Sequence, residues 1–158
     1  MTPRNGSAAE REQRTLLLDR VFDAPRDVVF KAWSEPEHLI NWWGPRGFTS
    51  DIEKMEFRVG GAYRIHMRSP EGTDHWSQGI YREIVPPERL VMAGSWADAQ
   101  GTPTTPETVL TVTFEDRGAQ TRLTLHSVFE TVTARDAHRG GWSSSLDRLV
   151  EYLAAVRW

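Results

Sequence analysis

The sequence predicts an α+β protein with a helix-grip arrangement, in which a curved antiparallel sheet of about six or seven strands wraps around a long C-terminal helix. Two observations lead to this prediction. Short runs with alternating apolar residues follow one another along the chain, and a stretch with apolar residues at helical spacing comes after the last run. The turns between most runs are too short for parallel crossovers, so the sheet is predicted to be a meander.

The first strand is predicted after a polar N-terminal stretch. Residues 1–14 are polar and aperiodic, so we expect a flexible tail there. Residues 15–158 are expected to form one domain, because their number suits a single hydrophobic core. The apolar run Thr15–Phe22 predicts the first strand of that domain.

Two short helices are predicted next. Pro25 suits the first turn of a helix. Ser34 and Glu37 have the spacing of a capping box, which predicts that a second helix begins with Ser34 as its N-cap. That helix is expected to end before Gly44 and Pro45, because glycine suits the C-terminal position and proline cannot continue a helix.

The rest of the sheet is predicted from six further runs. They are Thr49–Phe57, Ala62–Arg68, His75–Val85, Arg89–Trp96, Thr108–Glu115 and Thr121–Phe129. The longest interruption, residues 97–107, is polar and contains glycine and proline, which predicts a mobile loop that borders a pocket entrance.

The C-terminal helix is predicted from Thr133 onward. Its apolar stripe is expected to face the sheet and consists of Trp142, Leu146, Leu149, Val150 and Leu153. The pair Gly140-Gly141 weakens this helix by roughly 1 kcal/mol per glycine. Three explanations remain open: close approach of a ligand or strand, a kink, or a later start of the helix.

Composition argues against several classes of function. A net charge of −3 disfavours nucleic-acid binding, and the absence of cysteine removes disulfides and thiolate chemistry. We expect a cytoplasmic protein, because the N-terminus lacks an apolar signal segment and the sequence has no run long enough for membrane insertion. A homodimer is possible, but the sequence has no interface signature.

Several motifs resemble a known superfamily in their order along the chain. They are Phe22-Asp23-Ala24-Pro25, Trp33-Ser34-Glu35-Pro36-Glu37-His38-Leu39, Trp42-Trp43-Gly44-Pro45, Gly60-Gly61-Ala62-Tyr63-Arg64 and Glu83-Ile84-Val85-Pro86-Pro87-Glu88-Arg89-Leu90. In these the chain resembles the START-like, or SRPBCC, superfamily, and within it the branch similar to the C-terminal domain of the activator of heat-shock protein ATPase. The resemblance implies a cavity between sheet and helix. It does not imply one reaction, because this architecture has many functions.

Candidate cavity residues follow from strand alternation and helical spacing. Tyr63, Ile65 and Met67 share a face, and for them plain core packing is preferred over ligand contact. The inward face of the strand with Trp76 and Gln78 stays open, as does which of Trp42 and Trp43 anchors a helix and which covers the pocket. The full set is Trp42, Trp43, Tyr63, Ile65, Met67, Trp76, Gln78, Met92, Trp96, Val112, Phe114, His138, Trp142, Ser145 and Leu146.

No catalytic constellation is recognisable, so an enzyme is neither predicted nor excluded. The histidines have no metal-ligand spacing, Gly60-Gly61 lacks the features of a phosphate loop, and we expect neither metal nor cofactor. Glu83 is expected to pair with a nearby arginine, and a buried acid is the alternative.

Three functions are weighed. Binding of a small apolar or aromatic molecule ranks first. A cyclase- or hydrolase-like enzyme that uses His138 or Glu83 ranks second, and a co-chaperone-like interaction module of the stress response ranks last.

Overall fold

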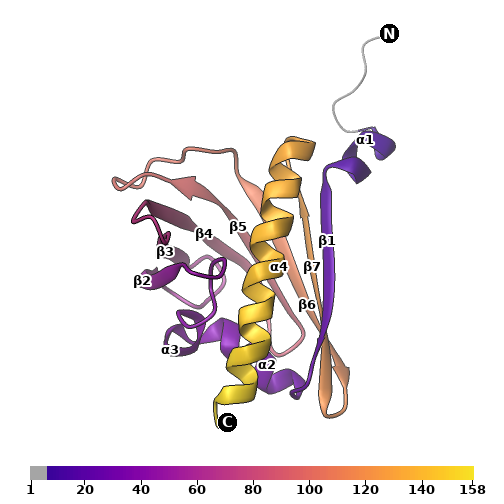
Figure 1. Ribbon diagram of the computed structural model, residues 1–158. Coiled ribbons are helices and arrows are strands. Elements are labelled where there is room, and N and C mark those ends of the chain that lie inside the picture. Colours follow the sequence, from indigo (N-terminus) through magenta and orange to yellow (C-terminus); the bar gives the residue numbers. More distant parts are fainter. Residues whose placement is uncertain (1–6) are drawn as a thin grey trace.

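One antiparallel sheet curves around a long helix in the computed structural model, which describes residues 7–158 (Figure 1). The sheet has seven strands in the order β1-β7-β6-β5-β4-β3-β2. The strands are β1 (Thr15–Phe22), β2 (Thr49–Met55), β3 (Ala62–Arg68), β4 (Asp74–Val85), β5 (Arg89–Ala97), β6 (Thr108–Arg117) and β7 (Gln120–Val128). The helices are α1 (Ala8–Gln13), α2 (Arg26–Ser34), α3 (Pro36–Leu39) and α4 (Val132–Ala155).

The predicted meander is confirmed for β2 to β7, and β1 and β2 form the two edges of the sheet. Strands β2 to β7 pair with their sequence neighbours, while β1 pairs antiparallel with β7, with Thr15 opposite Val128 and Phe22 opposite Thr121. Turn chemistry supports this order, since Gly118 takes a φ of 72° between β6 and β7 and its N–H donates to the Asp116 carboxylate at 2.9 Å.

Two helices differ from the prediction. Helix α1 lies within the stretch expected to be an irregular tail, and the Ser7 hydroxyl caps it by accepting from the Glu10 N–H; residues 1–6 lie outside the described residues. Helix α4 begins earlier than expected, with Thr131 as its N-cap. No helix in the described part of the chain is long and apolar enough to cross a membrane.

The predicted capping box at Ser34 is wrong. Ser34 is the last residue of α2, and Glu35 is the N-cap of α3 without a side-chain hydrogen bond. The reason is Pro36, which disfavours helical geometry at the residue before it; Glu35 accordingly has φ −116° and ψ 127°. The break between the helices therefore falls one residue later than predicted.

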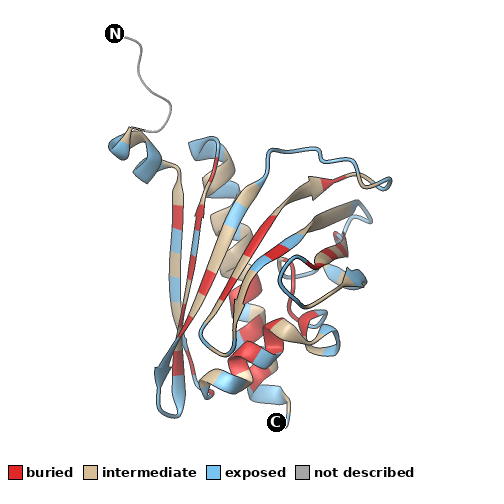
Figure 2. Cartoon of the chain, turned by 180° about the vertical axis from the view of Figure 1, so that it is seen from behind, coloured by how far each residue is buried: buried red, intermediate tan, exposed pale blue. Residues whose placement is uncertain are grey.

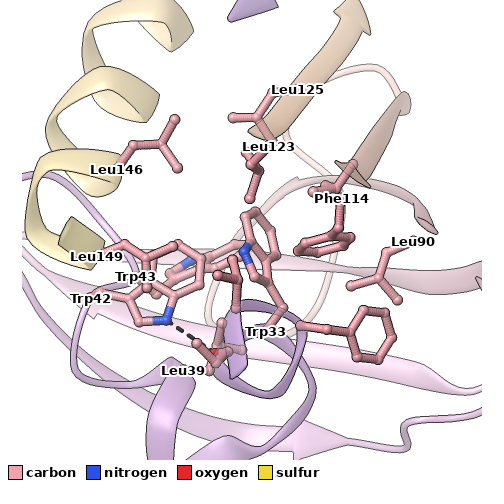
Figure 3. Close-up of a cluster of buried hydrophobic side chains, with 14 of the residues drawn as sticks. Trp33, Leu39, Trp42, Trp43, Leu90, Phe114, Leu123, Leu125, Leu146 and Leu149 are labelled. Carbon is pink, nitrogen blue, oxygen red and sulfur yellow. Dashed lines mark hydrogen bonds between the residues drawn. The ribbon is translucent and has the colours of Figure 1, made fainter. Parts of the chain in front are cut away.

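The packed core lies where α2, α3 and the C-terminal half of α4 meet the concave face of the sheet. Figure 2 shows buried residues gathered on α2 and alternating with less buried ones along the strands. Trp33 is 2% exposed and packs against Trp42 with ring centroids 4.7 Å apart, while Leu146 and Leu149 of α4 approach the same cluster (Figure 3). This buried cluster fixes the C-terminal half of α4 on the sheet.

Candidate functional site

A cavity of about 450 Å³ lies between the N-terminal half of α4, the concave face of the sheet and the segment after α3. Five strands contribute to it, and the loop between β5 and β6 borders it as predicted. The residues that line it are Trp43, Gly44, Pro45, Phe48, Tyr63, Met67, His75, Ser77, Met92, Gly94, Ser95, Trp96, Thr105, Pro106, Thr108, Leu110, Ser127, Phe129, Glu130, Ala134, Ala137, His138, Gly141, Trp142 and Ser145.

Small residues on α4 leave the room for this cavity. Ala134, Ala137, Gly141 and Ser145 follow each other at helical spacing and all line it. A Cβ at Gly141 would meet only the Pro45 side chain, at 3.8 Å, whereas one at Gly140 would meet open space. Because α4 begins at Val132 and continues through both glycines, a late helix start does not explain the pair. Gly141 keeps the cavity open.

The two neighbouring tryptophans after α3 have different places, which answers the question left open by the sequence. Trp42 is fully buried and its indole N–H donates to the Ala32 carbonyl at 3.1 Å, so it anchors the turn to α2. Trp43 lines the cavity and meets Trp142 edge to face at 5.2 Å. Trp142 in turn stacks on the core residue Trp33 at 5.8 Å. An aromatic wall thus joins the core to the cavity.

His138 connects α4 to β5 by a hydrogen bond at the edge of the cavity. The Trp96 indole N–H can only donate, so His138 Nε2 accepts from it at 3.1 Å, and His138 Nδ1 therefore carries the proton and donates to the Ala134 carbonyl at 2.8 Å. The ring also stacks on Phe129 at 4.3 Å. Both ring nitrogens have partners in this arrangement, which leaves no free lone pair for a general base.

A glycine pair seats Tyr63 on the sheet side of the cavity. Gly79 and Gly94 lie opposite each other in β4 and β5, and a Cβ at Gly94 would come within 2.3 Å of both the Tyr63 hydroxyl and the Gln78 carbonyl oxygen. Any larger residue at Gly94 would displace the phenol or the strand. Burial raises the pKa of Tyr63, so its hydroxyl is neutral.

Ser127 is a buried polar residue that sequence reasoning did not select. It is 2% exposed and lines the cavity, and its Oγ has no hydrogen-bond partner among the described residues. The signal was present in the sequence, because Ser127 falls in the inward phase of β7 together with Leu123 and Leu125. Its neighbours in that phase are apolar, so alternation predicts the face but does not distinguish the hydroxyl from the core residues around it.

Trp76 and Gln78 do not line the cavity, contrary to prediction. They lie on the outer face of the sheet, where the Trp76 indole N–H donates to the Glu53 carboxylate at 3.1 Å. Gln78 accepts from Arg64 Nη1 at 2.6 Å and donates to the Gly101 carbonyl at 2.8 Å. Gln78 therefore holds the loop between β5 and β6, and Ser77 of the same strand lines the cavity instead.

The other predicted residues divide between cavity and core. Those that line the cavity are Trp43, Tyr63, Met67, Met92, Trp96, His138, Trp142 and Ser145. Those that pack in the core outside it are Trp42, Ile65, Val112, Phe114 and Leu146. Ligand contact by the first group remains a prediction.

The remaining polar candidates lie away from the cavity. Glu83 accepts a hydrogen bond from Arg89 Nε at 2.9 Å. This ion pair is the one expected from the sequence, in preference to a buried acid. On the outer face, His66 Nε2 contacts Asp74 at 2.8 Å, and its Nδ1 contacts Asp51 at 3.2 Å. In residues 7–158, no group of three or more His, Asp or Glu side chains is placed to hold a metal ion.

Solved structures with the same fold come from several bacteria. A protein from Arthrobacter aurescens is 28% identical, with a TM-score of 0.84 over 92% of this chain and 88% of that one. A protein from Chromobacterium violaceum is 26% identical, with a TM-score of 0.75 over 87% and 95% of the two chains. The AHSA1 protein from Silicibacter pomeroyi is 25% identical, with a TM-score of 0.79 over 89% and 97%.

The family follows from the sequence as well as from the fold. No curated protein matches the chain significantly. The family model described as Activator of Hsp90 ATPase homolog 1-like protein matches residues 23–154, which include α2, α3, the strands β2 to β7 and nearly all of α4. The chain therefore belongs to the family of Activator of Hsp90 ATPase homolog 1-like proteins, within the START-like fold.

Proposed function

We propose that this protein binds an apolar or aromatic small molecule between the sheet and α4. The observation that carries the proposal is the cavity itself. Its volume of about 450 Å³ lies within the range of roughly 300–1,000 Å³ typical of small-molecule sites, and its walls are mainly apolar and aromatic side chains. A protein that needed only a stable core would fill such a space, because apolar voids are destabilising.

The side chains around the cavity favour binding over catalysis. The nitrogens of His138 are both hydrogen bonded within the fold, and the Glu83 carboxylate pairs with Arg89 away from the cavity. Neither of the groups expected to move protons in a cyclase- or hydrolase-like enzyme is therefore free to do so inside the cavity. We rank a ligand carrier or sensor above an enzyme for this reason.

A pair of variants on neighbouring residues tests the proposal. Gly141→Leu places a side chain in the cavity, whereas Gly140→Leu places the same side chain on the exposed side of α4. Leucine is the better helix former, so both variants should fold at least as stably as the natural chain. The probe is N-phenyl-1-naphthylamine, whose fluorescence rises in an apolar site.

The natural chain and Gly140→Leu should bind the probe alike. Gly141→Leu should bind it about tenfold more weakly or worse, which equals a loss of about 1.4 kcal/mol. Equal affinity in all three proteins would place the probe elsewhere and contradict a binding function for this cavity. Native mass spectrometry of the natural chain, purified from its own host, then asks which molecule occupies the site.

A further inference from the structure

A buried hydroxyl without a partner stands in the cavity wall. Ser127 lies near the end of β7 opposite Leu16 of β1, and its inward neighbours are Leu125 and Phe129. The hydroxyl oxygen is buried and unpaired within the described residues. An unsatisfied buried polar group is destabilising by roughly 1–3 kcal/mol. A residue with this cost and no structural partner points to a partner that enters the cavity.

The position gives the serine no local structural role. Ser127 is within a regular ladder in which β7 pairs with β1, so it neither caps a helix nor shapes a turn. An alanine would suit the same backbone without leaving an unpaired hydroxyl. By contrast, Thr121, the other fully buried hydroxyl on β7, donates to the Ala24 carbonyl at 2.7 Å. The chain satisfies one of these two hydroxyls itself and leaves the other, on a residue that lines the cavity, without a partner among the described residues.

Charge around the cavity restricts what the partner group is. No lysine or arginine lines it in the described part of the chain, so an anionic group would find no permanent cation there, and the lining histidine besides His138 is His75. The one carboxylate among the lining residues, Glu130, is exposed, and His138 is the neutral tautomer. A buried charge without a partner is far more unfavourable than a neutral polar group. The group that reaches Ser127 is therefore neutral.

We propose that Ser127 hydrogen bonds to one neutral hydroxyl or carbonyl group of the ligand, whose apolar body lies against the aromatic wall of Trp43 and Trp142. A serine hydroxyl both donates and accepts, so it serves an alcohol, a phenol or a ketone. This inference rests on the proposed binding function and narrows its ligand class. The ligand is a neutral, mostly apolar molecule with a polar group at one end.

Three probes with the same naphthalene ring test the inference: 2-naphthol, naphthalene and 2-naphthoate. Their binding is followed by the quenching of tryptophan fluorescence, because Trp43, Trp96 and Trp142 line the cavity. The proteins are the natural chain, Ser127→Ala and the control Ser143→Ala, which alters a partly exposed serine of α4 that does not line the cavity. The melting temperature of each unliganded protein is measured beside the titrations.

The expected pattern is specific to one probe and one variant. Ser127→Ala should weaken 2-naphthol about three- to tenfold, the worth of one neutral hydrogen bond, and leave naphthalene unchanged. Ser143→Ala should leave both affinities as they are, and 2-naphthoate should bind weakest to the natural chain. The unliganded Ser127→Ala protein should melt at the same or a higher temperature, because its hydroxyl has no partner to lose.

Each contrary result has its own meaning. Equal weakening of naphthol and naphthalene, a lower melting temperature for Ser127→Ala, or tight binding of 2-naphthoate would overturn the role of Ser127 while the binding function stands. If neither naphthol nor naphthalene binds to the natural chain, the proposed function fails and this inference fails with it.

Discussion

Arg148 of α4 holds the turn that carries one wall of the cavity. Its Nη1 donates to the carbonyls of Gly44 at 2.8 Å and of Trp43 and Pro45 at 3.2 Å, and its Nη2 donates to Asn41 at 3.2 Å. Partial burial lowers the pKa of the guanidinium, so desolvation opposes these contacts. Replacement by methionine keeps the apolar stem and removes every donor.

The loss of stability expected for Arg148→Met follows from the hydrogen bonds that the guanidinium donates. Three of them share one nitrogen, so we count one strong bond to a charged donor and one weaker bond, which together are worth about 2–3 kcal/mol. For a chain of this length, 1 kcal/mol shifts the melting temperature by about 2–4 °C. Arg148→Met should therefore lower the melting temperature by about 4–12 °C.

Circular dichroism measures this shift, and a neighbouring arginine provides the control. Arg46 pairs with Glu151 on the surface, with 58% and 64% of the two side chains exposed, and such pairs contribute little to stability. Arg46→Met should therefore melt close to the natural chain. Equal melting temperatures for the two variants would refute the reasoning, because the carbonyl contacts of Arg148 would then add nothing beyond those of an exposed arginine.

Two further predictions concern the sheet. The hydrogen bond to Asp74, helped by Asp51, raises the pKa of His66 above its ordinary value, so its stabilising effect is complete below about pH 6.5 and disappears as pH rises through the folded-state value. The unfolding free energy of the natural chain relative to His66→Gln should thus be larger at pH 5.5 than at pH 9, and an equal difference at both would contradict this. Gly94→Ala should give little folded protein in a solubility and circular dichroism assay, because its Cβ would lie 2.3 Å from the Gln78 carbonyl oxygen; a natural melting curve would show that the strand yields.

The sheet was predictable because alternation fixes both the strand and its buried face. The bounds of β1 and β3 match their apolar runs residue for residue. A slip of one residue would turn every buried side chain outward, so the pattern is strongly constrained. Strand β4 is the exception. Its outer face is covered by Arg64, which lies 5.4 Å over the Trp76 ring, and its register shifts between Tyr81 and Glu83. Both faces then carry large side chains, and alternation cannot tell them apart.

The boundary between core and cavity was not predictable from strand patterns. Ile65 and Met67 are two residues apart on one face of β3, yet Ile65 is packed in the core and Met67 lines the cavity. Both are apolar and buried, so their identities carry no distinguishing signal. The difference lies in what α4 places opposite the sheet: small residues such as Gly141 on one half, and leucines such as Leu149 on the other.

That division of α4 has a consequence for how such a protein diversifies. The C-terminal half of the helix stabilises the fold through Leu146, Leu149 and Leu153, while the half before Ser145 lines the cavity. Substitutions in the first region remove packing that the native state requires, whereas substitutions in the second change the shape of a void. Related proteins can therefore change which ligand the cavity accepts by substitutions in one half of a single helix, while the packing of the core stays the same.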